Sequence, residues 1–127
     1  NLPSSSAVFV ADDGHSVVGV ALVRGTEPGV SDFSAELDAI YVLPQLQGRR
    51  IGSRLLAQVV RWLSDRGHRS MQLWVLRDNP YRRFYERLSG ELLDGHKQND
   101  FGNATVTSVA YAWRDLKLLN NRLGALV

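Results

Sequence analysis

The first third of the chain alternates between apolar and polar positions with the period of two that is typical of β-strands. Residues Ala7–Ala11 and Ser16–Val23 follow this alternation, and Asp12–His15 between them has the composition of a hairpin turn. Gly19 interrupts the second segment, which predicts a bulge or a close approach of another part of the backbone. We therefore expect an antiparallel hairpin in this region.

A third strand and a long helix are expected next. Residues Ala35–Leu43 are rich in apolar and β-branched side chains, and Pro44 closes the segment. The period then changes to that of an amphipathic helix, with apolar side chains at Ile51, Leu55, Leu56, Val59, Val60 and Leu63. We expect this helix over about residues 48–66, with Gly67 placed to end it.

A second strand-and-helix unit follows. Residues Ser70–Leu76 are nearly all apolar, which is typical of a strand covered on both faces, and a strand after a crossover helix should lie parallel to the third strand. Asn79 and Pro80 are residue types that begin a helix, and Gly90 is placed to stop it. One face of this helix is aromatic and apolar, with Tyr81, Phe84, Tyr85 and Leu88.

The last part of the sequence predicts two more strands, Glu91–Lys97 and Ala104–Trp113, joined by a polar loop over residues 98–103. Residues Leu116–Leu126 form an amphipathic tail that suits a short helix. The predicted order is β-β-β-α-β-α-β-β, an α/β domain over residues 1–115 followed by a tail over residues 116–127. Its mixed sheet should be antiparallel at its start and parallel at its centre.

Composition narrows the class of protein. A chain of 127 residues that is 44% hydrophobic and 22% charged is expected to form one globular domain. It has no cysteine, no apolar run long enough to cross a bilayer and no signal-peptide pattern, so we expect a cytoplasmic protein without a membrane partner. The three histidines, His15, His68 and His96, are scattered and predict no metal site.

The charge is unevenly distributed along the chain. Residues 1–48 hold one basic and six acidic side chains, whereas residues 49–87 hold ten arginines and three acidic side chains. The basic middle should attract an anionic ligand, although a solvated helix face would look similar in sequence. Binding to nucleic acid is not expected, because the arginines lie in core-forming elements without a known nucleic-acid motif.

The turn before the long helix has the features of an anion site. A helix N-terminus presents backbone N–H groups without intrahelical acceptors, and these favour phosphate. Gly48 and Gly52 allow a ligand to approach the backbone, and Arg49, Arg50 and Arg54 add positive charge. A plain strand–turn–helix connection is the alternative. The glycine spacing fits neither a P-loop nor a dinucleotide-binding fingerprint.

Two blocks of the sequence resemble the GNAT family of N-acetyltransferases. In the first, residues 37–56 resemble the family's acetyl-CoA-binding motif, with Gln47, Arg50 and Gly52 on its three fixed positions; the family usually has glycine where Arg50 stands. The second block, Asn79-Pro80 followed by Phe84 to Gly90, resembles the family's Asn…Phe-Tyr-x-x-x-Gly segment. The resemblance covers roughly residues 8–113 and implies a GNAT-type mixed sheet.

The resemblance also implies acetyl-CoA as the cofactor and a set of residues that bind it. The backbone amides of Gln47, Gly48, Arg49, Arg50, Ile51, Gly52 and Ser53 would hold the diphosphate. The backbone of Tyr41, Val42 and Leu43 would pair with the pantetheine arm, with the Val42 N–H facing the thioester oxygen. Asn79 would contact the same arm, unless it serves only as a helix cap. Arg50 would either crowd a phosphate or pair with it.

Two catalytic residues are predicted. Glu36 is the candidate general base, and Asp38 follows two residues later on the same face of the strand. A close pair of carboxylates raises the pKa of one member, which suits a base. Tyr85 matches the family tyrosine that faces the cofactor sulfur and would act as the acid. The alternative for Glu36 and Asp38 is a pair of solvated carboxylates, and the alternative for Tyr85 is an aromatic residue of the core.

We therefore expect an N-acetyltransferase that moves an acetyl group from acetyl-CoA to a primary amine of a small molecule or peptide. The alternative is an inactive protein of the same fold that binds CoA or acts through dimer contacts. The usual N-terminal strand and two helices of GNAT domains have no counterpart before residue 7. Because this would leave a sheet edge and one flank uncovered, we expect a homodimer, with the C-terminal tail as a candidate contact.

Overall fold

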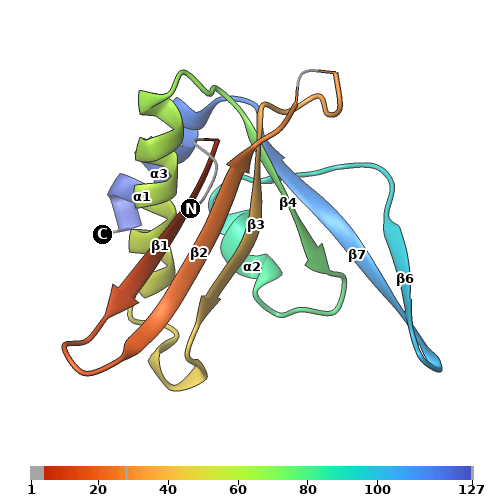
Figure 1. Cartoon of the computed structure of the whole chain (residues 1–127), viewed down its shortest axis with the longest axis horizontal. Coiled ribbons are helices and arrows are strands. Elements are labelled where there is room, and N and C mark those ends of the chain that lie inside the picture. Colours follow the sequence, from red (N-terminus) through yellow and green to blue (C-terminus); the bar gives the residue numbers. More distant parts are fainter. Residues whose placement is uncertain (1–4, 28, 127) are drawn as a thin grey trace.

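The computed structural model describes residues 5–27 and 29–126, and it contains the α/β architecture that the sequence predicts (Figure 1). The elements are β1 (Ser6–Asp12), β2 (Val17–Gly25), β3 (Ala35–Val42), the 3-10 turn η1 (Pro44–Leu46), α1 (Ile51–Asp65), β4 (Met71–Leu76), α2 (Arg82–Arg87), β5 (Glu91–Leu92), β6 (Lys97–Phe101), β7 (Ala104–Trp113) and α3 (Leu116–Leu126). The described strands form one mixed sheet of order β1-β2-β3-β4-β7-β5, with β6 also paired to β7.

The prediction of a polar loop over residues 98–103 is wrong. Residues Lys97–Phe101 form β6, which pairs antiparallel with β7 in a hairpin, and the predicted strand over residues 91–97 is reduced to the two residues of β5. Every residue of β6 is exposed, so the strand has no alternation of apolar and polar residues to reveal it. It forms because the long strand β7 offers an open edge from residue 104 to residue 108.

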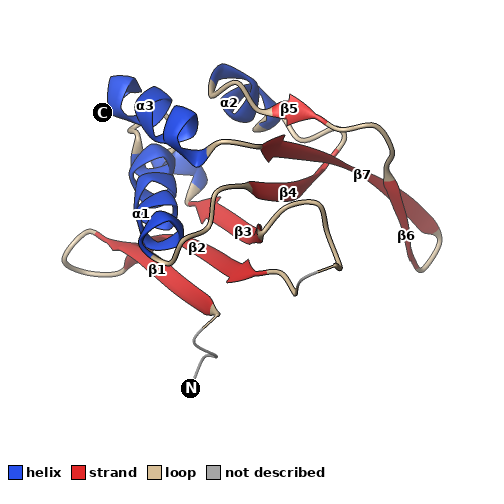
Figure 2. Ribbon diagram, turned by 90° about the horizontal axis from the view of Figure 1, so that it is seen from above, coloured by secondary structure: helices blue, strands red, loops and turns tan. Residues whose placement is uncertain are grey.

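The core lies between the sheet and the helices, and Figure 2 shows α1, α2 and α3 on the same side of the sheet. The apolar stripe of α1 is buried as predicted, with Leu55, Leu56, Val59, Val60 and Leu63 against the sheet. The helix ends in a Schellman motif, in which the His68 amide donates to the Leu63 carbonyl (3.0 Å) and Gly67 has a positive φ of 85°.

Close packing explains the glycine inside β2. A Cβ at Gly19 would lie 3.0 Å from Leu55 Cδ1 and 3.2 Å from the Tyr41 carbonyl oxygen, so a side chain would collide with both α1 and β3. The predicted close approach is therefore confirmed, and the pairing of β1 with β2 is also irregular beside it, after Ala11.

The C-terminal segment is helical and packs inside the protein. Leu116, Leu119 and Leu123 of α3 are almost fully buried in the same core as α1. The apolar face of the tail is therefore used within the chain rather than left open for a partner, and the homodimer stays a prediction that the structure of one chain does not test.

The feature of the sheet that positions the site is the short contact between its two parallel strands. Strands β3 and β4 pair only at Glu36 with Gln72 and at Leu37 with Leu73. The register of β3 with β2 also shifts after Leu37, because Leu22 faces Ala39 while Val23 faces Leu37. Beyond the shift, the end of β3 has a partner on one edge only, β2.

Candidate active site

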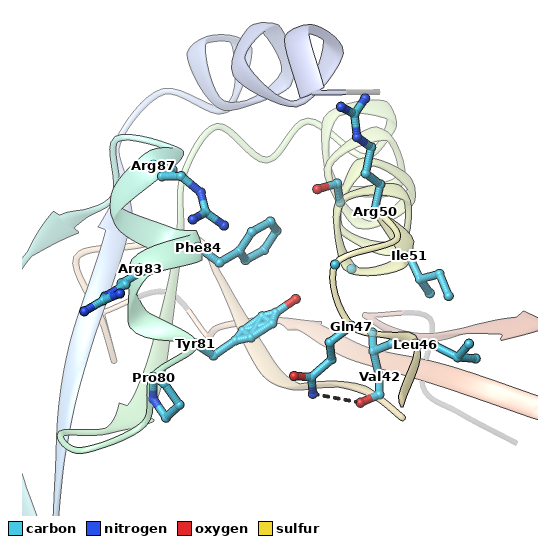
Figure 3. Close-up of a pocket in the computed structure, with 13 residues that line it drawn as sticks. Val42, Leu46, Gln47, Arg50, Ile51, Pro80, Tyr81, Arg83, Phe84 and Arg87 are labelled. Atoms are coloured by element: carbon cyan, nitrogen blue, oxygen red, sulfur yellow. Dashed lines mark hydrogen bonds between the residues drawn. The ribbon is translucent and has the colours of Figure 1, made fainter. Parts of the chain in front are cut away.

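A cleft of about 420 Å³ lies between the N-terminus of α1 and helix α2. It is lined by Val42, Leu46, Gln47, Gly48, Arg50, Ile51, Gly52, Ser53, Pro80, Tyr81, Arg83, Phe84 and Arg87 (Figure 3). Six of the residues predicted to hold the diphosphate are therefore in one wall, and the facing wall comes from α2, which is distant in sequence.

The loop that forms the first wall turns sharply before the helix. Gly48 and Arg50 both have left-handed backbone conformations, with φ of 87° and 65°, and the helix begins at Ile51 rather than at residue 48. The amides of Ile51, Gly52 and Ser53 have no hydrogen-bond acceptor in the described part of the chain, and no side chain caps the helix. These three N–H groups can therefore bind an anion.

A side-chain hydrogen bond connects this loop to the end of β3. Gln47 Nε2 donates to the Val42 carbonyl oxygen at 3.1 Å (Figure 3). The next amide, of Leu43, donates to the Val18 carbonyl on β2 at 2.9 Å. Because backbone groups of successive residues in a strand point to opposite edges, the N–H groups of Val42 and Ile40 point away from β2, toward the open edge of β3.

The charge of the cleft is positive. Arg50, Arg83 and Arg87 line it, no carboxylate does, and none of the three guanidinium groups has a salt bridge or hydrogen bond among the described residues. The arginine at the usual glycine position of the motif therefore does not close the cleft. Figure 3 shows its side chain extending along α1, away from Tyr81.

Tyr81 connects the two walls. Its amide donates to Asn79 Oδ1 at 2.8 Å, and its ring packs edge-on against Phe84 with centroids 4.9 Å apart. A Cβ built on Gly52 would overlap the Tyr81 hydroxyl, so this hydroxyl lies directly over the first turn of α1. Burial raises the pKa of the hydroxyl, and the positive charge of Arg87 offsets part of the rise. Tyr81 is therefore a neutral donor at physiological pH.

A second cavity of about 200 Å³ occupies the place where β3 and β4 separate. Its polar lining residues are Asp38, Asn79 and Tyr85, and the rest of its wall is formed by apolar residues of the two strands. Tyr85 is only 4% exposed, and its hydroxyl has no hydrogen bond among the described residues. Burial raises the pKa of this hydroxyl well above its ordinary value, so it stays protonated at neutral pH.

The predicted acidic pair is held by an arginine. Arg24 Nη2 lies 2.9 Å from Glu36 Oε2, and Arg24 Nε lies 3.0 Å from Asp38 Oδ2. Glu36 also accepts a hydrogen bond from Gln72 Nε2 at 3.1 Å. The two carboxylates are on one face, as predicted, but only Asp38 lines the second cavity; Glu36 lines neither cavity.

Other predicted residues lie outside the main cleft. Arg49 is exposed, Tyr41 is 53% exposed, and Leu43 lines neither cavity. Asn79 lines the second cavity and is not the N-cap of α2, because the regular helix starts three residues later. Its side chain instead stabilises the turn that leads into α2 through the bond to the Tyr81 amide.

The sequence pattern does not reveal that Tyr81, Arg83, Phe84 and Arg87 line the cleft. Tyr81 and Phe84 share one face with Tyr85, as predicted, and their rings are in contact, but Tyr81 and Phe84 also border the cleft. A signal was present, since Pro80, Arg83 and Arg87 recur at a spacing that places them on one side of a helix. That spacing does not reveal that this side faces the start of α1, because the docking of α2 is a tertiary contact.

The described residues contain neither a membrane-crossing helix nor a metal-binding cluster. No helix in this part of the chain is long and apolar enough to cross a membrane. Nor do the described histidine and acidic side chains form a group of three or more that is able to hold a metal ion.

Comparison with known proteins agrees with this geometry. The model of the acetyltransferase (GNAT) family matches residues 1–90. An uncharacterized N-acetyltransferase of Bacillus subtilis, YuaI, is 32% identical over 121 residues, which are 94% of this chain and 69% of YuaI.

Solved structures share the fold. An N-acetyltransferase from Staphylococcus aureus has a TM-score of 0.70 at 20% identity, over 87% of this chain and 68% of that one. YncA of Salmonella typhimurium, solved with its cofactor acetyl-CoA, has a TM-score of 0.70 at 17% identity, over 84% of this chain and 63% of that one. With the family match over residues 1–90 and the 32% identity to YuaI, these findings confirm what the two sequence blocks predicted: the chain belongs to the GNAT family of acetyltransferases.

Proposed function

We propose that this protein is an acetyl-CoA-dependent N-acetyltransferase that transfers an acetyl group to a primary amine of a small molecule or a peptide. The observation that carries the proposal is the alignment of three features. Unpaired amides begin α1, an open strand edge at Val42 adjoins them, and the hydroxyl of the buried Tyr85 opens into the cavity between β3 and β4 without a hydrogen-bond partner among the described residues. A diphosphate, a thioester arm and a leaving thiolate require these groups in this order.

The residues of the main cleft fit the cofactor. The amides of Ile51, Gly52 and Ser53 offer hydrogen-bond donors and the positive end of the helix dipole to a diphosphate. Arg50 adds an unpaired guanidinium group, and no carboxylate in the lining opposes the anion. Membership in the family and the acetyl-CoA seen with YncA support the same ligand. Acetyl-CoA supplies the activated acetyl group as a thioester.

The end of β3 would orient the acetyl group. The N–H of Val42 points away from β2, toward the gap, so it can donate to a carbonyl oxygen placed there and stabilise negative charge on that oxygen. The Gln47 side chain donates a hydrogen bond to the Val42 carbonyl, and this bond keeps the end of β3 attached to the loop. Of the three residues predicted to pair with the pantetheine arm, Val42 has the favourable orientation, and Tyr41 and Leu43 direct their N–H groups toward β2.

Tyr85 would supply a proton to the departing sulfur. Its side chain is buried, its hydroxyl faces the second cavity, and burial raises the pKa of this hydroxyl, so it is protonated throughout the neutral range. A tilted contact with Tyr111 and an edge-on contact with Trp113, with centroids 5.9 and 6.2 Å away, hold the ring in place. The fixed position and the available proton suit a general acid, whereas the raised pKa by itself makes the hydroxyl a weaker one.

The acidic pair would receive the amine. Glu36 stays the predicted base, and we extend the proposal to Asp38, which lines the cavity that Tyr85 faces. Arg24 binds both carboxylates, so an incoming ammonium group would compete with a guanidinium. The variants E36Q and D38N separate the two roles, because the base is the residue whose loss lowers kcat at saturating amine.

One observation favours a second candidate, an inactive CoA-binding protein of the same fold. Arg24 already neutralises both carboxylates, and the described part of the chain has no other acidic residue in the lining of either cavity. Such a protein would bind CoA through the α1 amides but would not transfer an acetyl group to an amine.

Two measurements test the proposal. Titration calorimetry with acetyl-CoA should give saturable binding, and the release of CoA thiol should depend on an amine chosen from a panel of small amines and peptide N-termini. Binding without amine-dependent thiol release would favour the inactive candidate. The absence of both heat and thermal stabilisation at millimolar acetyl-CoA would refute the cofactor assignment.

A further inference from the structure

We propose that helix α2 supplies a second phosphate subsite, in which Arg87 and Arg83 bind a phosphomonoester carried by the same ligand whose diphosphate lies at the start of α1. The inference rests on the proposed function and adds to it a preference for one form of the cofactor. CoA carries a phosphomonoester on its ribose in addition to the diphosphate, whereas dephospho-CoA has the diphosphate alone.

The first step is the placement of the two arginines. Arg83 and Arg87 are four residues apart on α2, so their side chains leave the same side of the helix, and both line the main cleft. Figure 3 shows the Arg87 guanidinium turned toward the cleft next to Phe84. Its charge also acts on the Tyr81 hydroxyl, which lies over Gly52. Arg87 is therefore near the amides that begin α1 and faces them from the opposite wall.

The second step is that these two guanidinium groups have no hydrogen-bond or salt-bridge partner among the described residues. Some arginines of the described structure do have one: Arg24 binds two carboxylates, and Arg114 binds Glu91 at 2.9 Å. On α2 itself, Arg82 donates to the Tyr111 hydroxyl at 3.0 Å. Three arginines outside the cleft are thus paired, whereas the side chains of Arg83 and Arg87 make no hydrogen bond or salt bridge in the described chain.

The one carboxylate on α2 does not change this. Glu86 accepts a hydrogen bond from the Tyr111 hydroxyl at 2.7 Å, and it is not part of the cleft lining. The bond also fixes α2 on strand β7, which keeps the side of the helix that carries Arg83 and Arg87 toward the cleft. The Arg87 guanidinium therefore faces a space without an opposing negative charge, and Arg83 lines the same cleft with its guanidinium turned outward (Figure 3).

The third step is the charge balance. The three arginines of the lining and roughly half a positive charge from the α1 dipole make the cleft strongly cationic. Each phosphate of a diphosphate diester carries a single negative charge, which Arg50 and the helix terminus nearly balance. A phosphomonoester adds about 1.5 to 2 further negative charges at neutral pH, and Arg83 and Arg87 match them. Arginine is suited to this group because its planar fork can bind two phosphate oxygens at once.

The experiment compares CoA with dephospho-CoA by titration calorimetry on the full chain and on three variants. R83Q and R87Q remove the proposed contacts. R61Q is the matched control, because Arg61 is exposed on α1 and lines neither cavity. Thermal melting of each variant checks the fold, which these exposed substitutions should leave intact.

The parent protein should bind CoA at least about tenfold more tightly than dephospho-CoA, the effect expected for charge-assisted hydrogen bonds to one phosphate. R87Q should remove most of this preference by weakening CoA alone, R83Q should reduce it, and R61Q should keep it. Equal affinity of the parent for both ligands, or an equal loss for both in R87Q, would overturn the second subsite. If the parent binds neither ligand, the proposed function itself fails, so the two failures are distinguishable.

Discussion

The contact between Gly52 and Tyr81 makes a quantitative prediction about stability. Gly52 is the second residue of α1, where alanine is normally favoured over glycine by up to about 1 kcal/mol. In this protein, however, the added Cβ would overlap the Tyr81 hydroxyl, while the ring carbon that bears the hydroxyl is 3.6 Å away. Only the hydroxyl therefore opposes the substitution.

The expected free energies follow from these contacts. Overpacking of this kind typically costs about 1–3 kcal/mol, so G52A alone should lower the free energy of unfolding by about 1 kcal/mol after the gain in helix propensity. Y81F alone should change it by less than about 0.5 kcal/mol, because the hydroxyl makes no hydrogen bond in the described structure. In the Y81F background, G52A should raise the free energy of unfolding by about 0.5–1 kcal/mol.

Urea denaturation followed by tryptophan fluorescence measures this cycle. G124A is the control, because Gly124 lies in α3 with no atom near its would-be Cβ, so it should stabilise both backgrounds equally. The double-mutant cycle should give a coupling of about 1.5 kcal/mol or more between positions 52 and 81. The same effect of G52A with tyrosine or phenylalanine at position 81 would show that the hydroxyl does not lie over the helix terminus.

Three further substitutions have expected outcomes. Y85F should lower amine-dependent thiol release by about 100-fold or more and leave the Kd for acetyl-CoA and the Tm unchanged; unchanged release would remove Tyr85 from the mechanism. R50G should raise the free energy of unfolding in urea by about 1 kcal/mol, because Arg50 has a left-handed φ of 65° that glycine adopts without strain. The same substitution should weaken CoA binding up to about tenfold, because it removes the guanidinium group. Tighter binding would show that Arg50 obstructs the ligand. S89G should also stabilise by about 1 kcal/mol, since Ser89 has a φ of 63° at the end of α2, and a loss of stability would contradict the left-handed conformation.

The prediction about the end of α2 shows how a local pattern identifies a feature but not its cause. The sequence places a helix stop at Gly90, and α2 ends shortly before it, at Arg87. The left-handed residue, however, is Ser89. Gly90 is required for a different reason, because a Cβ on it would lie 2.9 Å from Trp113 Cζ2 and 3.0 Å from the Tyr85 carbonyl oxygen.

For the catalytic candidates, too, the sequence identifies the residues, whereas the tertiary structure sets their surroundings. Strand alternation is enough to place Glu36 and Asp38 on one face, but the choice between them depends on the register shift in β3 and on Arg24 from the neighbouring strand. Their roles stay predictions. Tyr85 was named from its motif, whereas its burial, and therefore the raised pKa of its hydroxyl, comes from ring contacts with β7.

The sequence by itself determined the elements whose cause is local. The strand, the glycine turn and the amphipathic helix of residues 35–66 follow from the period of apolar residues and the conformational freedom of glycine, and the loop proposed to bind a diphosphate follows from them. The tertiary structure alone decided which residues face this loop. Tyr81, Arg83 and Arg87 reach it because α2 is fixed on β7, and β6 forms because β7 has an open edge. Contacts between segments distant in the chain depend on the packing of the whole core, which no local pattern records.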